Sequence, residues 1–244
     1  AWEDDIAEAV RYAVDNGAKV LSNSWGFIFG YKSAIVQEAI NYAYAKGAVV
    51  VFAAGNDGVE TPSYPSAGEN VIAVSATNSS DQHAWFTTYG PWIDVAAPGV
   101  DILSLRYGDW YGDGVHIVAG KYYIASGTSM ACPHVAGLAS LIFSKHPEFT
   151  NDEVEQVIKQ SADEVESPGW DIYSGYGRIN AEKALKINSV CVAKITYPHV
   201  NDLLLKTETL KINVSAYGTY FSDYVLEYGK GETPTSWTTL TSSY

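Results

Sequence analysis

The order of hydrophobic and polar positions predicts helices and strands that alternate over most of the chain. Apolar residues recur at helical spacing over 2–16, and a second helix is expected over 33–46; Gly17 and Gly47 end these helices. The uninterrupted apolar stretch 48–54 is typical of a parallel strand that is covered on both faces. This alternation predicts an α/β fold, with a mostly parallel sheet and helices on both of its faces.

The middle of the chain continues the pattern. The stretch from Met130 to Phe143 is small and apolar on nearly all sides, which predicts a helix through the centre of the domain. Thr150 and Glu153 have the spacing of a capping box and predict the start of another helix. Further strands are expected at 20–21, 71–74 and 93–96, a surface hairpin or loop rich in Gly and Tyr at 106–123, and a last helix that ends near 187.

The pattern changes at about residue 188. Beyond it, β-branched and aromatic residues alternate with polar ones at 190–195, 210–214 and 224–228, which predicts strands with one solvent face. We therefore expect one domain over 1–187 and a truncated all-β extension over 188–244. Such a short segment is similar to the start of a β-sandwich accessory module, a kind of domain that binds, spaces or protects more often than it catalyses.

Composition narrows the classes of partner. The chain has 244 residues, of which 28 are acidic and 15 basic, and its formal charge of −13 argues against nucleic acid and anionic membrane surfaces. No apolar stretch approaches the roughly 20 residues that cross a bilayer, and the first residues lack the pattern of a signal peptide. Cys132 and Cys191 are too few for a disulfide framework, and we expect both to be unpaired.

Ser129 is the candidate nucleophile. Gly127 allows a tight entry into the following helix, and Thr128 is expected to cap its first turn. The first N–H groups of a helix lack intrahelical partners, so negative charge that develops beside Ser129 would be stabilised. This placement suits an acyl-transfer nucleophile. The residues of this segment alone leave open a second interpretation, a capped core helix that happens to carry a serine.

The segment 127–131, together with 133–137, resembles the nucleophile segment of the subtilisin-like serine proteases (subtilases). The resemblance implies a serine endopeptidase that acts on polypeptides through an acyl-enzyme, with Ser129 as the nucleophile and no required cofactor. The stretch 53–58 resembles the oxyanion loop of the family, in which the side-chain amide of Asn56 would donate to the oxyanion. Taken locally, Asn56 is also what a turn before a glycine requires.

The same resemblance implies a substrate-binding cleft. Ser24, Trp25 and Gly26 match the edge that pairs with an extended substrate, and Ala53, Ala54 and Gly55 match the facing wall of the primary pocket, with Ser63 at its base. Small walls leave room for a large apolar or aromatic side chain before the scissile bond. Trp25 either narrows the neighbouring subsite or is an ordinary core tryptophan, and both interpretations stay open.

A catalytic base and its orienting acid are missing from this pattern. His134 lies five residues after Ser129, about 140° around the helix, so it points elsewhere. None of the histidines has the sequence context that the family uses: His83, His116, His134, His146 and His199. The resemblance therefore covers about 5–187, a subtilisin-like domain that is incomplete at the N-terminus. We expect the catalytic Asp and His upstream, and the chain alone to be inactive.

Parts of the sequence also fit two other functions. An α/β-hydrolase esterase would need an acid and then a histidine downstream of Ser129, and it would leave the Asn56 loop without a role. A non-catalytic, subtilase-like remnant that acts as a binding module would need no triad. An Asp and a His in the family's sequence contexts upstream of the chain would favour the protease, and their absence would favour the remnant.

The resemblance also carries expectations about setting and cofactors. It implies a secreted protein and an N-terminal propeptide in the complete protein, and Asn78 and Asn213 are possible glycosylation acceptors. Asp94 and the carbonyl groups near 66–70 could form a structural calcium site, as in some relatives, although a capped turn is the better explanation of this aspartate. No metal is expected at the catalytic site.

Overall fold

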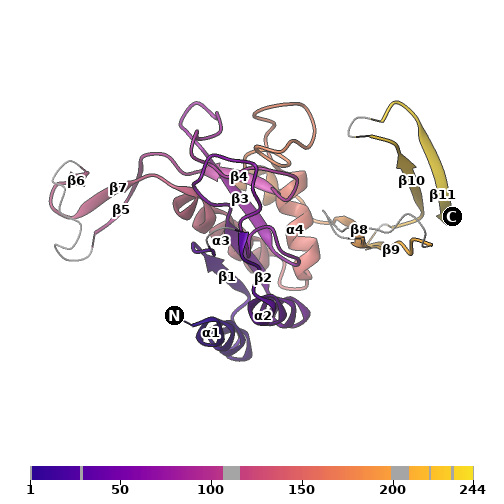
Figure 1. The fold of residues 1–244 in the computed structure, drawn as a ribbon, viewed down its shortest axis with the longest axis horizontal. Coiled ribbons are helices and arrows are strands. Elements are labelled where there is room, and N and C mark those ends of the chain that lie inside the picture. Colours follow the sequence, from indigo (N-terminus) through magenta and orange to yellow (C-terminus); the bar gives the residue numbers. More distant parts are fainter. Residues whose placement is uncertain are drawn as a thin grey trace. The chain divides into compact units, whose positions relative to one another are not determined.

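The computed structural model contains a four-stranded parallel sheet in the order β1-β2-β3-β4, with helices packed around it (Figure 1). Its registers place Ser22 opposite Val51, Val51 opposite Ile72, and Val74 opposite Val95. The strands are β1 (Val20–Asn23), β2 (Val49–Ala53), β3 (Ile72–Thr77) and β4 (Val95–Pro98). The expected parallel sheet is confirmed.

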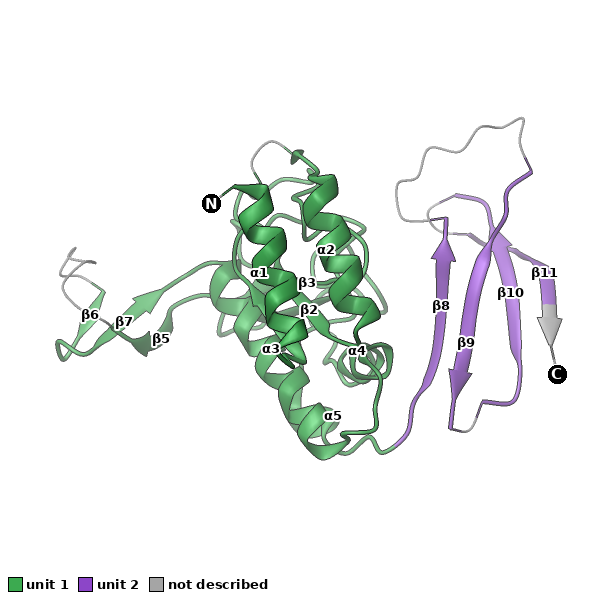
Figure 2. Cartoon of the chain, turned by 90° about the horizontal axis from the view of Figure 1, so that it is seen from below, with its two compact units in different colours: residues 1–188 green, residues 189–244 purple. Residues whose placement is uncertain are grey.

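The structure describes residues 2–27, 30–106, 116–198, 209–219, 221–231 and 234–243. The chain divides into two units, 1–188 and 189–244, which Figure 2 shows in separate colours. The sheet and the helices belong to the first unit. No helix in the described part of the chain is long and apolar enough to cross a membrane.

Two helices cover one face of the sheet. α1 (Glu3–Asp15) packs against α2 (Ala34–Ala45), whose first turn is capped by the Ser33 hydroxyl, which accepts a hydrogen bond from the Val36 amide at 3.3 Å. Buried side chains of both helices form one cluster with Val50 and Phe52 of β2. Because side chains alternate along a strand, the buried Val49 and Val51 point to the opposite face.

The opposite face is covered by α3 (Thr128–Lys145), which contacts all four strands, and by α4 (Asn151–Gln160) beside it. The capping box of α4 is confirmed: the Glu153 amide donates to Thr150 Oγ1 at 3.2 Å, and the Thr150 amide donates to Glu153 Oε2 at 2.7 Å. A short helix, α5 (Ala181–Ala184), follows. Helices therefore lie on both faces, as the alternating pattern predicts.

α3 differs from the expected helix through the domain centre. Ala131, Cys132, Val135 and Ala139 are buried against the sheet, but one side of the helix is exposed. The exposed positions recur at helical spacing and form what we call the open side of α3: Pro133, His134, Gly137, Ser140 and Leu141. The prediction was wrong because the described residues place the sheet on only one side of this helix.

An antiparallel arm precedes α3. It consists of β5 (Ile102–Leu105), β6 (Ile117–Val118) and β7 (Tyr122–Ala125) in the order β5-β7-β6, and it projects from the helices and the parallel sheet (Figures 1 and 2). The expected hairpin therefore begins earlier than predicted, at Ile102. Residues 107–115 of the predicted segment lie outside the described residues.

The second unit is all β, as expected. β8 (Cys191–Tyr197) pairs with β9 (Asn213–Gly218), and β10 (Tyr224–Gly229) pairs with β11 (Trp237–Ser243), each pair antiparallel. β9 begins three residues after the predicted start at 210, and the pattern did not predict β11. His199 lies outside the described residues.

Candidate active site

Ser129 is the second residue of α3, at the end of the helix that faces the carboxyl ends of the strands. The chain enters the helix through Gly127, whose φ of 155° favours glycine and whose amide donates to the Gly99 carbonyl at 2.8 Å. Ser129 is half-buried. Its own backbone N–H is one of the first-turn donors that have no intrahelical acceptor. This end of the helix therefore favours negative charge that develops beside the serine hydroxyl.

A pair of hydrogen bonds connects Ser129 to Ser24, which follows β1. The Ser24 hydroxyl donates to the Ser129 carbonyl at 2.9 Å, and the Ser129 hydroxyl donates to the Ser24 carbonyl at 3.5 Å. Pro133 explains the first bond. It stands four residues after Ser129 and has no N–H, so the Ser129 carbonyl lacks its helical donor and accepts from Ser24 instead.

Thr128 does not cap the helix, contrary to expectation, because Gly127 occupies the N-cap position. The Thr128 hydroxyl instead donates to Asn56 Oδ1 at 3.0 Å and accepts from the Gly55 amide at 3.2 Å. The Thr128 backbone amide also donates to Asn56 Oδ1, at 2.9 Å. Both donors bind the amide oxygen, so the Asn56 NH₂ group has no acceptor among the described residues and is available as a donor.

Gly26, Gly55 and Ser63 come together from three separate segments. A Cβ atom on Gly26 would lie 3.4 Å from Ser63 Oγ, and a Cβ atom on Gly55 would lie 3.3 Å from the same oxygen. Gly55 also has a φ of 109° and approaches Thr88 Oγ1, to 2.9 Å from its would-be Cβ atom, so a side chain here would be strained and would clash. The absence of side chains at Gly26 and Gly55 therefore allows both segments to approach Ser63 closely.

The other residues of the predicted pocket wall are mostly buried. Ala53 is at the end of β2, and the side chain of Ala54 packs in a cluster with Ala73 and Ile93. The Trp25 ring makes edge contacts with Phe27 and Phe52, at centroid distances of 5.9 and 5.0 Å. Its indole N–H donates to Asn23 Oδ1 at 3.1 Å. This is the packing of a core tryptophan, and a role of Trp25 in a subsite stays a prediction.

The described histidines do not contact Ser129. His134 Nδ1 lies 2.8 Å from the Met130 carbonyl on the open side of α3, in agreement with the expectation that it points elsewhere. His83 and His146 pair with Glu166 and Glu148, and His116 lies beside Tyr123 in the arm. Among the described residues, the Ser129 hydroxyl has Ser24 as its hydrogen-bond partner, so they provide no base for it.

Asp94 binds an ammonium group of the protein itself. Lys159 Nζ lies 2.7 Å from Asp94 Oδ1 and 2.6 Å from Glu155 Oε1, and the Ala73 amide donates to Asp94 Oδ2 at 2.8 Å. Burial alone would lower the pKa of Lys159, but the two carboxylates outweigh it and raise that pKa above its ordinary value. In the part of the chain that the structure describes, no group of three or more His, Cys, Asp or Glu residues is arranged to hold a metal ion.

The two cysteines are unpaired, which confirms the prediction. Cys132 is buried where the N-terminal part of α3 packs on the sheet. Its Sγ lies 3.5 Å from the Asn23 carbonyl oxygen and 3.7 Å from Ser22 Oγ. Burial raises the pKa of its thiol. Cys191, in β8, is exposed. Cys132 therefore acts as a packing residue beneath the first turns of α3, which its place among small apolar residues had indicated.

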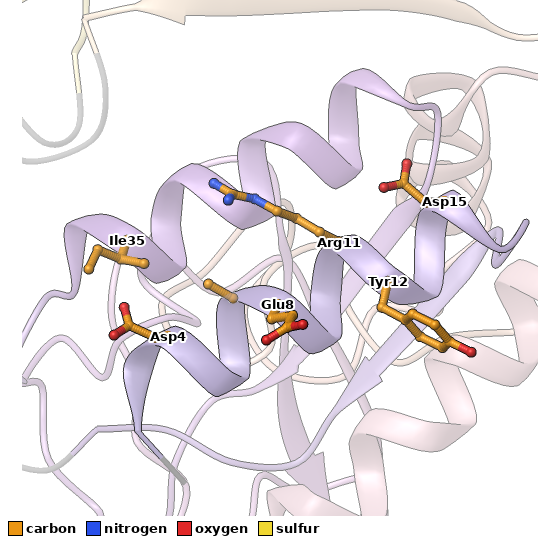
Figure 3. A pocket seen from close by; sticks show the side chains of 7 residues that line it. Asp4, Glu8, Arg11, Tyr12, Asp15 and Ile35 are labelled. Atoms are coloured by element: carbon orange, nitrogen blue, oxygen red, sulfur yellow. The ribbon is translucent and has the colours of Figure 1, made fainter.

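A separate hollow lies on the outer side of α1. It has a volume of about 400 Å³ and is lined mainly by polar side chains of that helix. Figure 3 shows Asp4, Glu8, Arg11 and Asp15 projecting from α1, with Ile35 of α2 at one end. Arg11 pairs with Glu38 at 3.7 Å. None of the predicted site residues lines this hollow, so the site that contains Ser129 remains the candidate active site.

Comparison with known proteins agrees with this geometry. The model of the subtilase family of peptidases matches residues 1–177. The thermophilic serine proteinase of Bacillus sp. strain AK1 is 45% identical over 181 residues, which are 74% of this chain and 41% of that protein. Thermitase of Thermoactinomyces vulgaris is 41% identical over 181 residues, 74% of this chain and 59% of that protein.

The cell wall-associated protease of Bacillus subtilis is 36% identical over 205 residues, 75% of this chain and 21% of that protein. The chain thus spans between about a fifth and three fifths of the length of these relatives. The matched region contains the whole parallel sheet, the Asn56 loop and α3. The chain therefore belongs to the subtilase family, the subtilisin-like serine proteases.

Proposed function

We propose that this chain supplies the nucleophile, the oxyanion donors and the substrate-binding cleft of a serine endopeptidase. The observation that carries the proposal is the orientation of Asn56. Two donors of Thr128 bind its Oδ1 at 2.9 and 3.0 Å, which leaves its NH₂ group free beside the N-terminus of the helix that carries Ser129. A donor held in place in this way before the reaction begins stabilises charge that develops only in the transition state.

The reaction follows from these positions. Ser129 Oγ would attack the carbonyl carbon of the scissile peptide bond while its proton passes to a base. The carbonyl oxygen would gain negative charge and accept hydrogen bonds from Asn56 Nδ2 and from the Ser129 amide. The bond to nitrogen would then break, the base would protonate the leaving amine, and water would hydrolyse the acyl-enzyme.

We infer that the base, a histidine, and its orienting aspartate lie outside these 244 residues. Three features support this: the absence of a base beside Ser129 in the described residues, an apolar groove beside β1, and the open side of α3. Both surfaces suit a further segment that would bring the base to Ser129. On this proposal, residues 1–244 alone are inactive. The alternative is a subtilase-like remnant that binds polypeptides without cleaving them.

Labelling with a fluorophosphonate probe tests the proposal. In the complete protein, Ser129 should be labelled stoichiometrically, and Ser129→Ala should remove the label, because only an activated serine reacts quickly. Residues 1–244 alone should not react. Labelling of this shorter chain would show that a histidine within it acts as the base. No labelling of the complete, folded protein would favour the non-catalytic remnant.

Replacement of Asn56 tests the oxyanion donor. Asn56→Ala should lower kcat by about 10² to 10³, a magnitude known from the same kind of change in a subtilisin, with little change in KM. Thr128→Val should lower kcat by a smaller factor, because it removes the hydroxyl that orients the amide and keeps the backbone donor. Asn16→Ala, at an exposed helix end, is the control. A loss confined to KM would return Asn56 to the role of a turn residue.

The small residues around Ser63 support a preference for large apolar or aromatic residues before the scissile bond. Gly26 and Gly55 present no side chain toward Ser63, and the segments 24–27, 53–58 and 63–66 contain no basic residue. A peptide library cleaved by the complete protein should therefore show Phe, Tyr, Leu or Met enriched at that position. Enrichment of Asp or Glu there would contradict the assignment of the pocket.

A further inference from the structure

The arm formed by β5, β6 and β7 has one face that is apolar and exposed. Cross-strand pairs place Leu103 opposite Ile124, and Leu105 and Val118 each opposite Tyr122. Paired residues lie on the same face, and alternate residues of a strand share it, so these five side chains form one surface, which we call the apolar arm face. Leu105 is 82% exposed and Leu103 is 55% exposed.

Such a surface needs an explanation. Soluble proteins rarely leave contiguous apolar side chains in water, and those that do commonly use them to bind another molecule. β5 is also at the outside of the arm in the order β5-β7-β6, so one edge of it has no partner strand among the described residues. An unpaired edge flanked by apolar side chains can accept an extended polypeptide as an added strand.

The arm is joined directly to the candidate active site. β7 ends at Ala125, and Ser126 accepts a hydrogen bond from the Asp101 amide at 2.9 Å, which closes the base of the arm. The next residue, Gly127, donates to the Gly99 carbonyl at 2.8 Å and begins the turn into Ser129. The arm is thus anchored beside the carboxyl end of β4.

The order of the strands indicates the direction in which a bound substrate would run. Ser24 follows β1, Asn56 follows β2 and Gly99 follows β4, and the strands lie in the order β1-β2-β3-β4. Residues 24–26, which are proposed to bind the part of the polypeptide before the scissile bond, are therefore on the β1 side of Ser129. A substrate that continues past Ser129 moves toward the β4 side, where the arm begins.

We propose that the apolar arm face binds an apolar segment of the polypeptide substrate, several residues after the scissile bond. This inference rests on the proposed function. At about 3.3 Å per residue, the four residues from Tyr122 to Ser126 span about 13 Å, so the outer part of the face would contact residues roughly four or more positions beyond the bond.

Binding is tested in the complete protein with Ser129→Ala, so that peptides stay intact. Two fluorescein-labelled peptides share their sequence up to the third residue after the bond and then continue with either a Leu/Ile/Tyr tail or a Ser/Gly tail. Fluorescence anisotropy should show about tenfold tighter binding of the apolar tail. The double variant Leu105→Ser/Tyr122→Ser should lose this preference. The matched control, Tyr12→Ser/Ile35→Ser, changes one aromatic and one aliphatic exposed residue on α1 and α2 and should keep it.

Hydrolysis by the protein with Ser129 intact provides the second measurement. The double arm variant should lose the advantage of the apolar tail in kcat/KM and should leave kcat/KM for the Ser/Gly tail unchanged. If neither peptide is cleaved, the proposed function fails, whereas the binding measurement with Ser129→Ala still decides the arm. A tail preference in binding that depends on Leu105 and Tyr122 shows in either case that the arm face binds an apolar polypeptide segment, and cleavage in addition shows that this segment belongs to the substrate.

Three results would overturn the inference. Equal affinity for both tails would show that the face binds no apolar segment. A loss of melting temperature in the double arm variant well beyond that of the control would show that the complete protein covers the face itself. Concentration-dependent dimers that the arm variant abolishes, seen by sedimentation, would assign the face to a second copy of the chain.

Discussion

One edge strand of the parallel sheet is covered by another segment, and the other edge strand has no such cover among the described residues. The edge at β4 is covered by residues 163–179, which we call the closing segment. The Ala96 amide donates to the Gly177 carbonyl at 2.9 Å, and the Ile179 amide donates to the Ala96 carbonyl at 2.9 Å. The edge at β1 has no neighbouring strand among the described residues, and a groove of about 780 Å³ lies beside it.

The side chains at the two edges differ as much as the backbone does. Charged pairs hold the closing segment, with Arg178 contacting Asp81 at 2.6 Å and Asp163 at 2.7 Å. The groove at β1 is lined instead by mainly small and apolar residues of α1 and β1 and by the aromatic pair that follows β1, including Ile6, Ala9, Leu21, Trp25 and Phe27.

Permanent edge strands usually carry charges, prolines or bulges that prevent pairing. The apolar β1 edge has the character of a surface that the proposed further segment would cover.

The largest effect is expected at the closed edge. Lys159→Met would leave Asp94 and Glu155 without their common partner in a site where the Lys159 and Asp94 side chains are 15% and 19% exposed. We expect it to lower the free energy of unfolding by about 3 kcal/mol, the low end for a broken buried pair. Urea unfolding of the complete protein measures this.

The control for Lys159→Met is Lys186→Met. The pair of Lys186 with Glu182 is exposed, with side chains that are 71% and 79% accessible, and its loss should cost no more than about 0.5 kcal/mol. Equal effects of the two substitutions would mean that the buried pair does not hold the β4 edge.

An intermediate effect is expected at the open edge, and only in the complete protein. Ala9 is exposed and lines the groove beside β1. Ala9→Glu should change the unfolding free energy of residues 1–244 by no more than about 0.5 kcal/mol, because the carboxylate stays in water. In the complete protein the same carboxylate would be buried without a partner and should cost about 2 kcal/mol.

Tyr12→Glu on the outer side of α1 is the control for Ala9→Glu and should have the same small effect in both proteins. The decisive quantity is the difference between the two chains, measured by urea unfolding under identical conditions. If Ala9→Glu were equally harmless in the complete protein, the groove would stay open to water there, and the comparison of the two edges would lose its basis.

The smallest effect concerns pH at the closed edge. Lys183, Asn180 and Arg178 donate to Asp163 and lower its pKa from 3.8 to about 2. A lowered pKa in the folded protein means that this contribution to stability is present above about pH 4 and is lost as the pH falls through 2. Asp163 is partly exposed, so the contribution should stay below about 1 kcal/mol.

Asp163→Asn should therefore destabilise the protein slightly at neutral pH and make its stability fall less between pH 4 and pH 2. Thermal melts of both proteins across this range measure the difference. Curves that run parallel over the whole range would show that Asp163 is not protonated within it, or that its partners do not act on its pKa in solution.

Much of the fold could be predicted because its signals are local. The apolar stretch 48–54 predicts β2, and Thr150 with Glu153 predicts α4, since each depends on residues that are neighbours in sequence. β11 was missed because Thr and Ser dominate it and no apolar alternation marks its face. The open side of α3 was missed for another reason: small residues such as Gly137 fit a buried helix and an exposed one equally well.

The sequence indicated candidate site residues but not the hydrogen bonds between them. Resemblance to the subtilases pointed to Ser129 and Asn56, but the bond between Thr128 and Asn56 joins segments 72 residues apart, which no local pattern indicates. The capping role expected for Thr128 followed from position alone, and a tertiary partner outweighed it. Likewise, Asp94 has the appearance of a turn residue until α4 brings Lys159 to it.

The two cysteines differ in exposure, so their reaction with a thiol reagent distinguishes the folded from the unfolded protein. Cys132 has no exposed surface and a thiol whose pKa is raised by burial, whereas Cys191 is exposed. A colorimetric thiol reagent should therefore consume one equivalent quickly in the native protein and two after denaturation. The slow second equivalent measures how often the region between α3 and the sheet opens to solvent. That rate would report directly whether a segment docked beside β1 tightens the site.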